Sequence, residues 1–203
     1  MANKFKAPAI DQLTFDTAPN RLTLLRMIAV PAVVYFLSWK TWNGDVTACV
    51  VFCLAAITDW FDGYLARATK AITIYGKLMD PLADKFLVVA VLIMLQNLGR
   101  IDPYVVMVLI CREMGITSLR ALASAEGVII AAGSGGKWKA ALQMIGIPFL
   151  IIDAPFFGLV QCKLIGTVLI YVSIFLSLTS ALTYALDFFR GLREKLKAKQ
   201  QKS

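Results

Sequence analysis

Four aspartates occur close together in a part of the sequence that is otherwise rich in apolar residues. Asp59 and Asp62 lie in one apolar segment, and Asp80 and Asp84 lie at the start of the next. In a membrane helix, a charged side chain at the centre costs about 2.5–3.5 kcal/mol on insertion scales, so four could cost on the order of 10 kcal/mol. Carboxylates kept at such a cost are expected to have a function, as ion ligands or as acid–base groups.

The spacing of these aspartates predicts how helices would present them. A helix advances by about 100° per residue, so Asp59 and Asp62 fall on one face, and Asp80 and Asp84 share a face of the next helix. Two such antiparallel helices could bring the four carboxylates together, where they would repel one another and take up protons. Divalent cations relieve this repulsion, and an all-oxygen ligand set suits Mg²⁺ or Mn²⁺ better than zinc.

Two glycines in the same stretch favour a bound ligand. A glycine inside a helix costs about 1 kcal/mol relative to alanine, so Gly63 and Gly76 indicate close approach of another helix or of a ligand. The alternative is structural: the aspartates could pair with Arg67, Lys77 or Lys85, or form a proton relay. Pairing alone does not account for the two glycines at these positions.

Together these residues form the pattern D-x2-D-G-x2-A-R-x8-G-x3-D-x3-D. Its fixed positions are Asp59, Asp62, Gly63, Ala66, Arg67, Gly76, Asp80 and Asp84. At every position it resembles the signature of the CDP-alcohol phosphatidyltransferase family, and the resemblance covers about residues 20–190. It implies an integral membrane enzyme that transfers a phosphatidyl group from a CDP-linked lipid to an alcohol and releases CMP.

The resemblance also implies roles for individual residues. Asp59, Asp62 and Asp80 would hold two divalent cations, Mg²⁺ or Mn²⁺, and Asp84 would take the proton from the attacking hydroxyl and count as a fourth metal ligand. The residues implied to bind the nucleotide are Asn20, Thr23, Asp59, Gly63, Ala66, Arg67 and Gly76. The sequence has no histidine, so any general base must be a carboxylate, Lys, Tyr or Cys.

The composition predicts the helices that must position these residues. Of the 203 residues, 59% are hydrophobic, and the mean hydropathy is +0.70; soluble domains have about 45–50% apolar residues. Several apolar segments approach the roughly 20 residues that cross a bilayer. The sequence therefore predicts an all-α polytopic membrane protein with six transmembrane helices. The predicted spans are Leu22–Trp39, Val46–Ala68, Leu78–Leu98, Tyr104–Ala123, Trp138–Phe157 and Leu164–Phe189.

The basic residues predict the orientation. If both termini are cytoplasmic, the outer connectors hold only Lys40, Arg100 and Lys163, and the remaining Lys and Arg lie on or near the inside. The active site would then face the cytoplasm from a bacterial inner membrane. The net charge of +8 fits anionic membrane lipids and excludes nucleic acid as the expected partner. The predicted parts are a cytoplasmic juxtamembrane segment (1–19), the six-helix domain (20–190) and a basic tail (191–203).

Four further cations are candidates for binding the acceptor. Arg112 and Arg120 lie in the fourth predicted span, and Lys137 and Lys139 lie at the start of the fifth. A phosphate group on the acceptor would pair with such a cluster. Glu113 is adjacent to Arg112 but is expected to point about 100° away from it. Ordinary cytoplasmic flanking is the alternative for all of them except Arg112, which lies deeper.

Several segments resemble the bacterial family members that use sn-glycerol 3-phosphate. They are Pro19–Arg26, Leu78–Lys85, Cys111–Arg120 and Gly136–Lys139. This resemblance implies CDP-diacylglycerol and glycerol 3-phosphate as substrates, and membership of the family implies a homodimer. Sister transferases that use inositol phosphate, phosphatidylglycerol or serine share parts of these segments and stay open as alternatives. A cation transporter and a catalytically silent lipid-binding scaffold are the rivals from other classes.

Overall fold

The computed structural model describes the backbone of residues 18–69, 74–128, 135–156 and 160–200. Side chains are described for residues 24–58, 85–128, 136–154, 161–197 and 200. The chain divides into an N-terminal unit, Met1–Met94, and a C-terminal unit, Leu95–Ser203.

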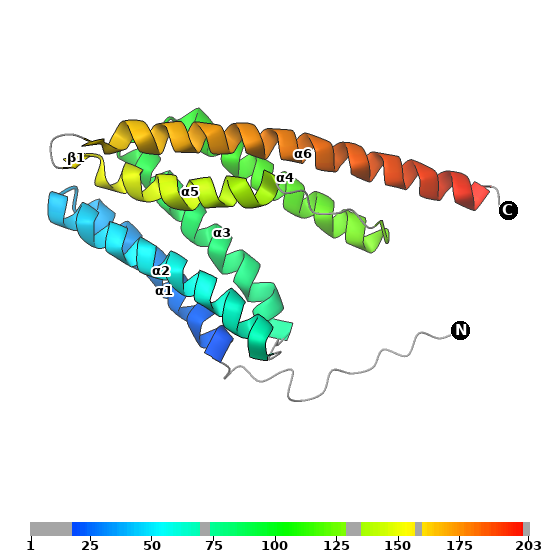
Figure 1. Ribbon diagram of the computed structural model, residues 1–203, viewed down its shortest axis with the longest axis horizontal. Helices are drawn as coiled ribbons and strands as arrows, with labels where there is room; N and C mark the ends of the chain where they lie inside the picture. The colour runs from blue at the N-terminus through cyan, green and yellow to red at the C-terminus, as the bar shows by residue number, and fades with distance from the viewer. Residues whose placement is uncertain (1–17, 70–73, 129–134, 157–159, 201–203) are drawn as a thin grey trace. The chain divides into compact units, whose positions relative to one another are not determined.

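All the regular secondary structure in the described part of the N-terminal unit is helical (Figure 1). Its helices are α1 (Ala18–Ser38), α2 (Trp42–Thr69) and α3 (Ile74–Asn97), the last of which continues into the C-terminal unit. α1 packs along α2, and the buried side chains include Val33 and Leu37 of α1 and Ala48, Phe52 and Ala55 of α2. Apolar side chains of the first two predicted spans therefore form a helix–helix core here.

A tight turn joins α1 to α2. Lys40 adopts a left-handed backbone conformation, with φ at 53°, and the Thr41 hydroxyl accepts a hydrogen bond of 3.2 Å from the Gly44 N–H, as a helix N-cap does. A Cβ atom at Gly44 would lie 2.5 Å from the Phe36 carbonyl oxygen. Glycine is thus required here because the end of α1 and the first turn of α2 approach too closely for a side chain.

The C-terminal unit contains three long helices and a short hairpin. The helices are α4 (Pro103–Ala125), α5 (Gly135–Ile152) and α6 (Cys162–Gln200), and the antiparallel strands are β1 (Pro155–Phe156) and β2 (Val160–Gln161). α5 and α6 lie side by side, and α4 also packs against α6 (Figure 1). Ile147 and Leu150 of α5 and Ile170 of α6 are fully buried. Among the described residues, the fold is all-α apart from this pair of two-residue strands.

Two helix ends differ most from the predicted spans. α5 ends at Ile152, before the predicted end at Phe157, because Asp153 has a φ of 45° and Pro155 disfavours helix in the residue before it. α6 continues to Gln200, beyond the predicted end at Phe189. The described part of the predicted basic tail is therefore an extension of α6 rather than a separate segment.

The described helices differ in how well they suit a bilayer. Only Cys162–Lys197 of α6, among the described residues, is long and apolar enough to cross one; Leu24–Ser38, Trp42–Thr58 and Lys85–Asn97 are apolar but shorter. α6 also exposes large apolar side chains at intervals of three and four residues, which is typical of a helix face in contact with lipid or with another apolar surface. These side chains are Leu164, Val168, Tyr171, Phe175, Leu178, Leu182, Leu186 and Phe189.

The contact between α5 and α6 gives a stability prediction. A Cβ atom at Gly166 would lie 2.8 Å from Leu150 Cγ and 2.9 Å from the Gly146 carbonyl oxygen. Overpacking of this kind typically costs about 1–3 kcal/mol, so we expect Gly166→Ala to lower the midpoint of thermal unfolding. Gly115→Ala on α4 is the matched control, because a Cβ there meets no atom within 4 Å. Equal midpoints for the two variants would contradict the close helix contact.

Candidate functional site

The aspartate pattern lies on two consecutive helices of the N-terminal unit. Asp59 and Asp62 belong to α2, which continues to Thr69, and Asp80 and Asp84 belong to α3, which begins at Ile74. The predicted placement on helices is thus confirmed for all four positions. Their side chains lie outside the described residues, so the convergence of the carboxylates stays a prediction.

The positions predicted to bind the nucleotide occur on the same helices and on α1. Gly63, Ala66 and Arg67 follow the aspartates on α2, and Gly76 lies in the first turn of α3. Asn20 and Thr23 lie in the first turns of α1. The side chains of these residues also lie outside the described part of the chain.

A divalent cation fits the chemistry of this donor set. Four carboxylates on two adjacent helical segments offer only oxygen ligands, which Mg²⁺ and Mn²⁺ prefer. Elsewhere, among the side chains that the structure describes, no group of three or more His, Cys, Asp or Glu residues could hold a metal ion. The aspartates therefore remain the candidate ligands.

Arg26 is a residue near this region that the predicted site did not include. It lies on α1, one helical turn after Thr23, and its residue surface is only 2% exposed. A buried arginine in an apolar helix is costly and usually has a functional or pairing role. The sequence carried that signal, an arginine within the first predicted span, but no motif position was assigned to it.

Two of the four predicted acceptor-site cations meet at one carboxylate in the C-terminal unit. Arg112 Nη1 lies 3.2 Å from Glu113 Oε2, and the Lys139 ammonium, from α5, pairs with the same oxygen. Arg112 Nε also donates a hydrogen bond of 3.0 Å to the backbone oxygen of Ser177 on α6. We call Arg112, Glu113 and Lys139 the Glu113 cluster; it connects α4 with α5 and, through Arg112, with α6.

This pairing corrects one expectation. Glu113 was expected to point away from Arg112 because adjacent helical residues differ by about 100°. That expectation is wrong, since the two side chains are long enough for their charged ends to meet beside the helix. The cations of the cluster are well buried, with Arg112 and Lys139 side chains 9% and 10% exposed, whereas Glu113 is 26% exposed.

The other two predicted cations are more accessible. Arg120 lies about 12 Å further along α4 than Arg112, and its guanidinium carbon is 5.6 Å from the centre of the Tyr184 ring on α6. That distance permits a cation–π contact. Lys137 is exposed near the start of α5. The structure thus brings Arg112 and Lys139 together and leaves Arg120 and Lys137 on the surface.

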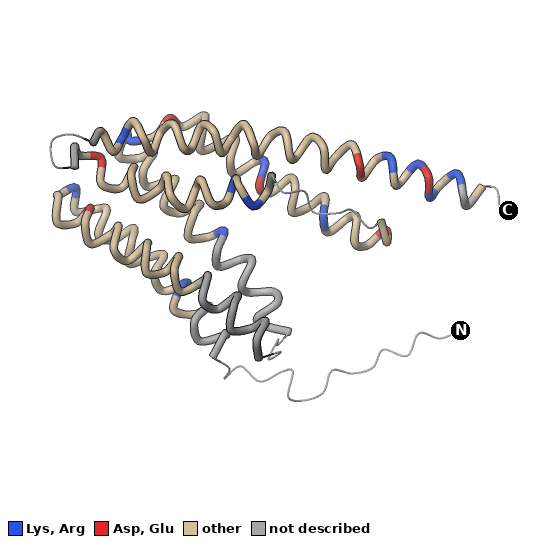
Figure 2. Tube along the Cα trace, viewed as in Figure 1, with Lys and Arg blue, Asp and Glu red and all other residues tan. Residues whose placement is uncertain are grey.

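The end of α6 carries further charges that the predicted site does not use. Figure 2 shows basic and acidic residues following one another along its last turns. Asp187 and Arg190 lie 3.8 Å apart on the helix, and Lys195 reaches Glu126 at the end of α4, with Nζ 3.2 Å from Oε2. This second ion pair connects the extension of α6 with the C-terminal end of α4.

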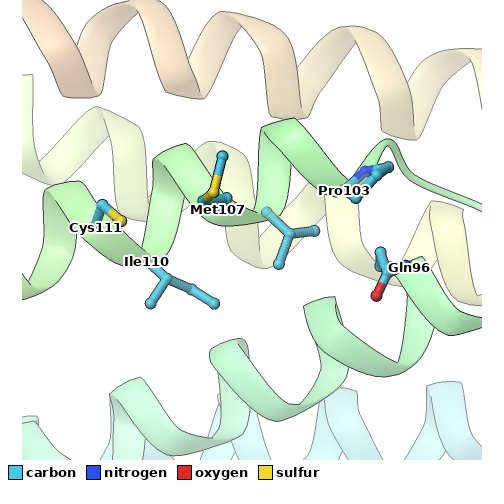
Figure 3. A pocket seen from close by; sticks show the side chains of 6 residues that line it. Gln96, Pro103, Met107, Ile110 and Cys111 are labelled. Carbon is cyan, nitrogen blue, oxygen red and sulfur yellow. The ribbon is translucent and has the colours of Figure 1, made fainter.

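A separate apolar pocket lies beside α4. It has a volume of about 270 Å³ and is lined by Gln96, Pro103, Val106, Met107, Ile110 and Cys111 (Figure 3). Its lining contains no charged side chain. This pocket is therefore unsuited to a phosphate and is distinct from the Glu113 cluster.

Comparison with known proteins identifies the family. The model of the CDP-alcohol phosphatidyltransferase family matches residues 16–179. The chain belongs to the CDP-alcohol phosphatidyltransferase family. The match includes all four aspartates and all four predicted acceptor-site cations, and it ends before the charged extension of α6. Members of this family generally depend on divalent metal ions, which agrees with the donor set of the aspartates.

Similar family members come from bacteria and plants. A protein of Rickettsia bellii is 30% identical over 83% of this chain and 93% of its own length. One of Bacillus subtilis is 34% identical over 86% of this chain and 96% of its own, and one of Arabidopsis thaliana is 36% identical over 88% and 82%. The first two are named CDP-diacylglycerol–glycerol-3-phosphate 3-phosphatidyltransferase, and the third has the same name with the number 2.

Proposed function

We propose that this protein transfers the phosphatidyl group of CDP-diacylglycerol to sn-glycerol 3-phosphate, giving phosphatidylglycerophosphate and CMP. The observation that carries the proposal is the agreement in name of relatives from distant organisms, each aligned over most of this chain. The complete aspartate pattern and the basic residues of α4 and α5 support it, because they supply the groups that this reaction requires. The reaction belongs to phospholipid biosynthesis.

The proposed setting is a bacterial inner membrane crossed six times by residues 20–190. The exposed apolar side chains of α6 support contact with lipid. The distribution of Lys and Arg supports cytoplasmic termini and an active site open to the cytoplasm. Residues 1–19 would be a cytoplasmic juxtamembrane segment, and the basic tail, 191–203, would face the anionic inner leaflet. A homodimer is part of this proposal.

Two basic residues on the outer side of the proposed topology share one acidic partner. Arg100 Nε and Lys163 Nζ lie 3.4 Å and 3.6 Å from the two carboxylate oxygens of Asp153. These are two of the three basic residues assigned to the outer connectors. The pairing leaves the count of outer Lys and Arg unchanged, because Asp and Glu contribute little to the positive-inside bias.

In the proposed active site, Asp59, Asp62 and Asp80 hold two divalent cations, with Asp84 as a further ligand. Bound there, Mg²⁺ or Mn²⁺ would supply positive charge that stabilises the pyrophosphate oxygens during transfer. The nucleotide would lie against Gly63, Ala66 and Gly76, whose small size permits its close approach. Arg67, Asn20 and Thr23 would supply a positive charge and hydrogen-bonding groups to it.

Asp84 is the proposed general base. Its carboxylate would take the proton from the acceptor hydroxyl as that oxygen forms a bond to the phosphorus of the phosphatidyl group. The bond between this phosphorus and the bridging pyrophosphate oxygen breaks, and CMP leaves with the electron pair. Arg112, Arg120, Lys137 and Lys139 would meanwhile bind the phosphate of the acceptor and orient its hydroxyl.

The test is CMP release by the purified protein with CDP-diacylglycerol and Mg²⁺. We expect release with glycerol 3-phosphate and little with inositol phosphate, serine or phosphatidylglycerol, because the relatives are named for glycerol 3-phosphate. The basic residues themselves would disfavour only acceptors without a phosphate monoester, such as serine. Release with another of these acceptors instead would reject the proposed substrate while keeping the family chemistry. No release with any acceptor, from protein that still binds the nucleotide, would reject the proposed activity.

A further inference from the structure

Glu113 occupies the centre of the proposed acceptor site although its charge has the wrong sign for binding a phosphate. One of its oxygens, Oε2, pairs with Arg112 on its own helix and with Lys139 on α5. A carboxylate repels phosphate, so Glu113 is unsuited to contact the acceptor's phosphate group. Its position between the two cations indicates that it acts on them.

The two cations depend on this carboxylate for their positions. The Arg112 and Lys139 side chains are about nine-tenths buried, and two positive charges so close together would repel one another in a poorly solvated place. A shared carboxylate oxygen offsets that repulsion and fixes both charged ends at one point. The cluster keeps a net charge of +1 and so can still attract an anion.

Arg112 is held from a second direction as well. Its Nε donates to the Ser177 backbone oxygen on α6 at 3.0 Å, while Nη1 faces Glu113. A guanidinium fixed by two different groups keeps one orientation. Binding a phosphate then costs less conformational entropy, because the side chain is already ordered. Lys139 has a flexible side chain, and the Glu113 carboxylate draws its ammonium to the same place.

We propose that Glu113 is a positioning residue of the acceptor site, whose carboxylate holds Lys139 and Arg112 in the arrangement that binds the phosphate of the acceptor. This inference rests on the proposed function and deepens it. It assigns the specificity for a phosphate-bearing acceptor to a cluster of two cations and one carboxylate rather than to cations alone. Arg120 and Lys137 are the other two basic residues proposed for the acceptor site.

The test compares Glu113→Gln with Glu126→Gln. Glu126 is the matched control because its carboxylate also pairs with a lysine of another helix, Lys195, with Nζ 3.2 Å away, but lies outside the Glu113 cluster. We expect Glu113→Gln to raise the KM for glycerol 3-phosphate by about tenfold or more. Without the carboxylate, the buried Arg112 and Lys139 lose the partner that positions them, and they bind the acceptor's phosphate less well. In Glu113→Gln, the KM for CDP-diacylglycerol and the affinity for the nucleotide should stay near wild type. In Glu126→Gln, these two quantities and the KM for glycerol 3-phosphate should all stay near wild type.

A double variant separates positioning from a merely structural role. If Glu113 acts through Lys139, Glu113→Gln should change the acceptor KM much less in a Lys139→Met background than in the wild-type background. Additive effects in the two backgrounds would overturn the proposal. So would an unchanged or lowered acceptor KM for Glu113→Gln, because a carboxylate that merely competed with the phosphate would give tighter binding when removed.

The wild-type protein provides the control for the proposed function itself. If it does not use glycerol 3-phosphate, the proposed function fails before any variant is compared. If it does, and Glu113→Gln has the acceptor KM of the wild type, only the assignment of Glu113 fails. A Glu113→Gln protein that is poorly folded would show reduced binding of the nucleotide too. In that case Glu113→Asp provides the second measurement: it keeps the charge but shortens its reach, and the proposal expects a raised acceptor KM with the nucleotide bound normally.

Discussion

Asp84→Asn is expected to lower CMP release by about 10²–10⁴-fold, the usual contribution of a general base. The amide has nearly the same size as the carboxylate but cannot accept the proton of the attacking hydroxyl. Binding of a CDP nucleotide in the presence of Mg²⁺ should persist in part, because the other three aspartates remain. Turnover and nucleotide affinity measured on the same preparation check this prediction.

The control for this variant is an aspartate outside the site. Asp187 lies on α6, where its partly exposed carboxylate is 3.8 Å from Arg190, and an exposed ion pair contributes little to stability. Asp187→Asn should therefore keep both turnover and nucleotide binding. A folded Asp84→Asn protein that no longer binds the nucleotide would contradict the assignment as base and indicate that Asp84 is mainly a metal ligand.

The helices that carry the aspartates were predictable because two signals agreed. The apolar segments gave the helices, and the spacing of Asp59, Asp62, Asp80 and Asp84 fitted one face of each. The structure places all four positions within α2 and α3. The number of membrane spans is a harder inference, because hydrophobicity alone does not show whether a helix crosses a bilayer or packs within a protein.

The ends of the helices were less predictable, for different reasons. α6 continues beyond its apolar part to Gln200 because the residues that follow, rich in Lys, Arg and Leu, have high helix propensity. Along this extension Lys195 also contacts Glu126 at the end of α4. The early end of α5 could have been predicted, because Pro155 follows shortly after Ile152 and disfavours helix before it. The predicted span extended past Pro155 because the residues that follow are apolar.

The arrangement around Glu113 could not be predicted from local spacing. The angle of about 100° between adjacent helical residues describes where the side chains begin, whereas the charges of Arg112 and Glu113 lie several bonds away. Lys139 is 26 residues further along the chain, so its pairing with Glu113 depends on how α4 and α5 are placed. The sequence predicted the cations as candidates, and the structure added the carboxylate that joins two of them.

Asp62→Asn should have a different effect from Asp84→Asn. Asp62 is proposed as a metal ligand, and loss of even an outer partner of a metal ligand typically lowers metal affinity by about 10–100-fold. Replacing the ligand itself should have at least the upper value of this effect, so Mg²⁺-dependent binding of a CDP nucleotide should weaken by about 100-fold or more. Titration of the nucleotide into purified protein at fixed Mg²⁺ measures this loss.

The comparison between the two variants distinguishes a base from a ligand more sharply than activity does, because both variants should be inactive. If Asp62 holds the metal, a higher Mg²⁺ concentration should restore part of the nucleotide binding of Asp62→Asn, and a chelator should reduce wild-type binding to the level of this variant. Asp84→Asn should need little additional Mg²⁺ to bind the nucleotide. Wild-type nucleotide affinity in Asp62→Asn, or wild-type binding that survives the chelator, would show that the nucleotide is held without the proposed metal ions.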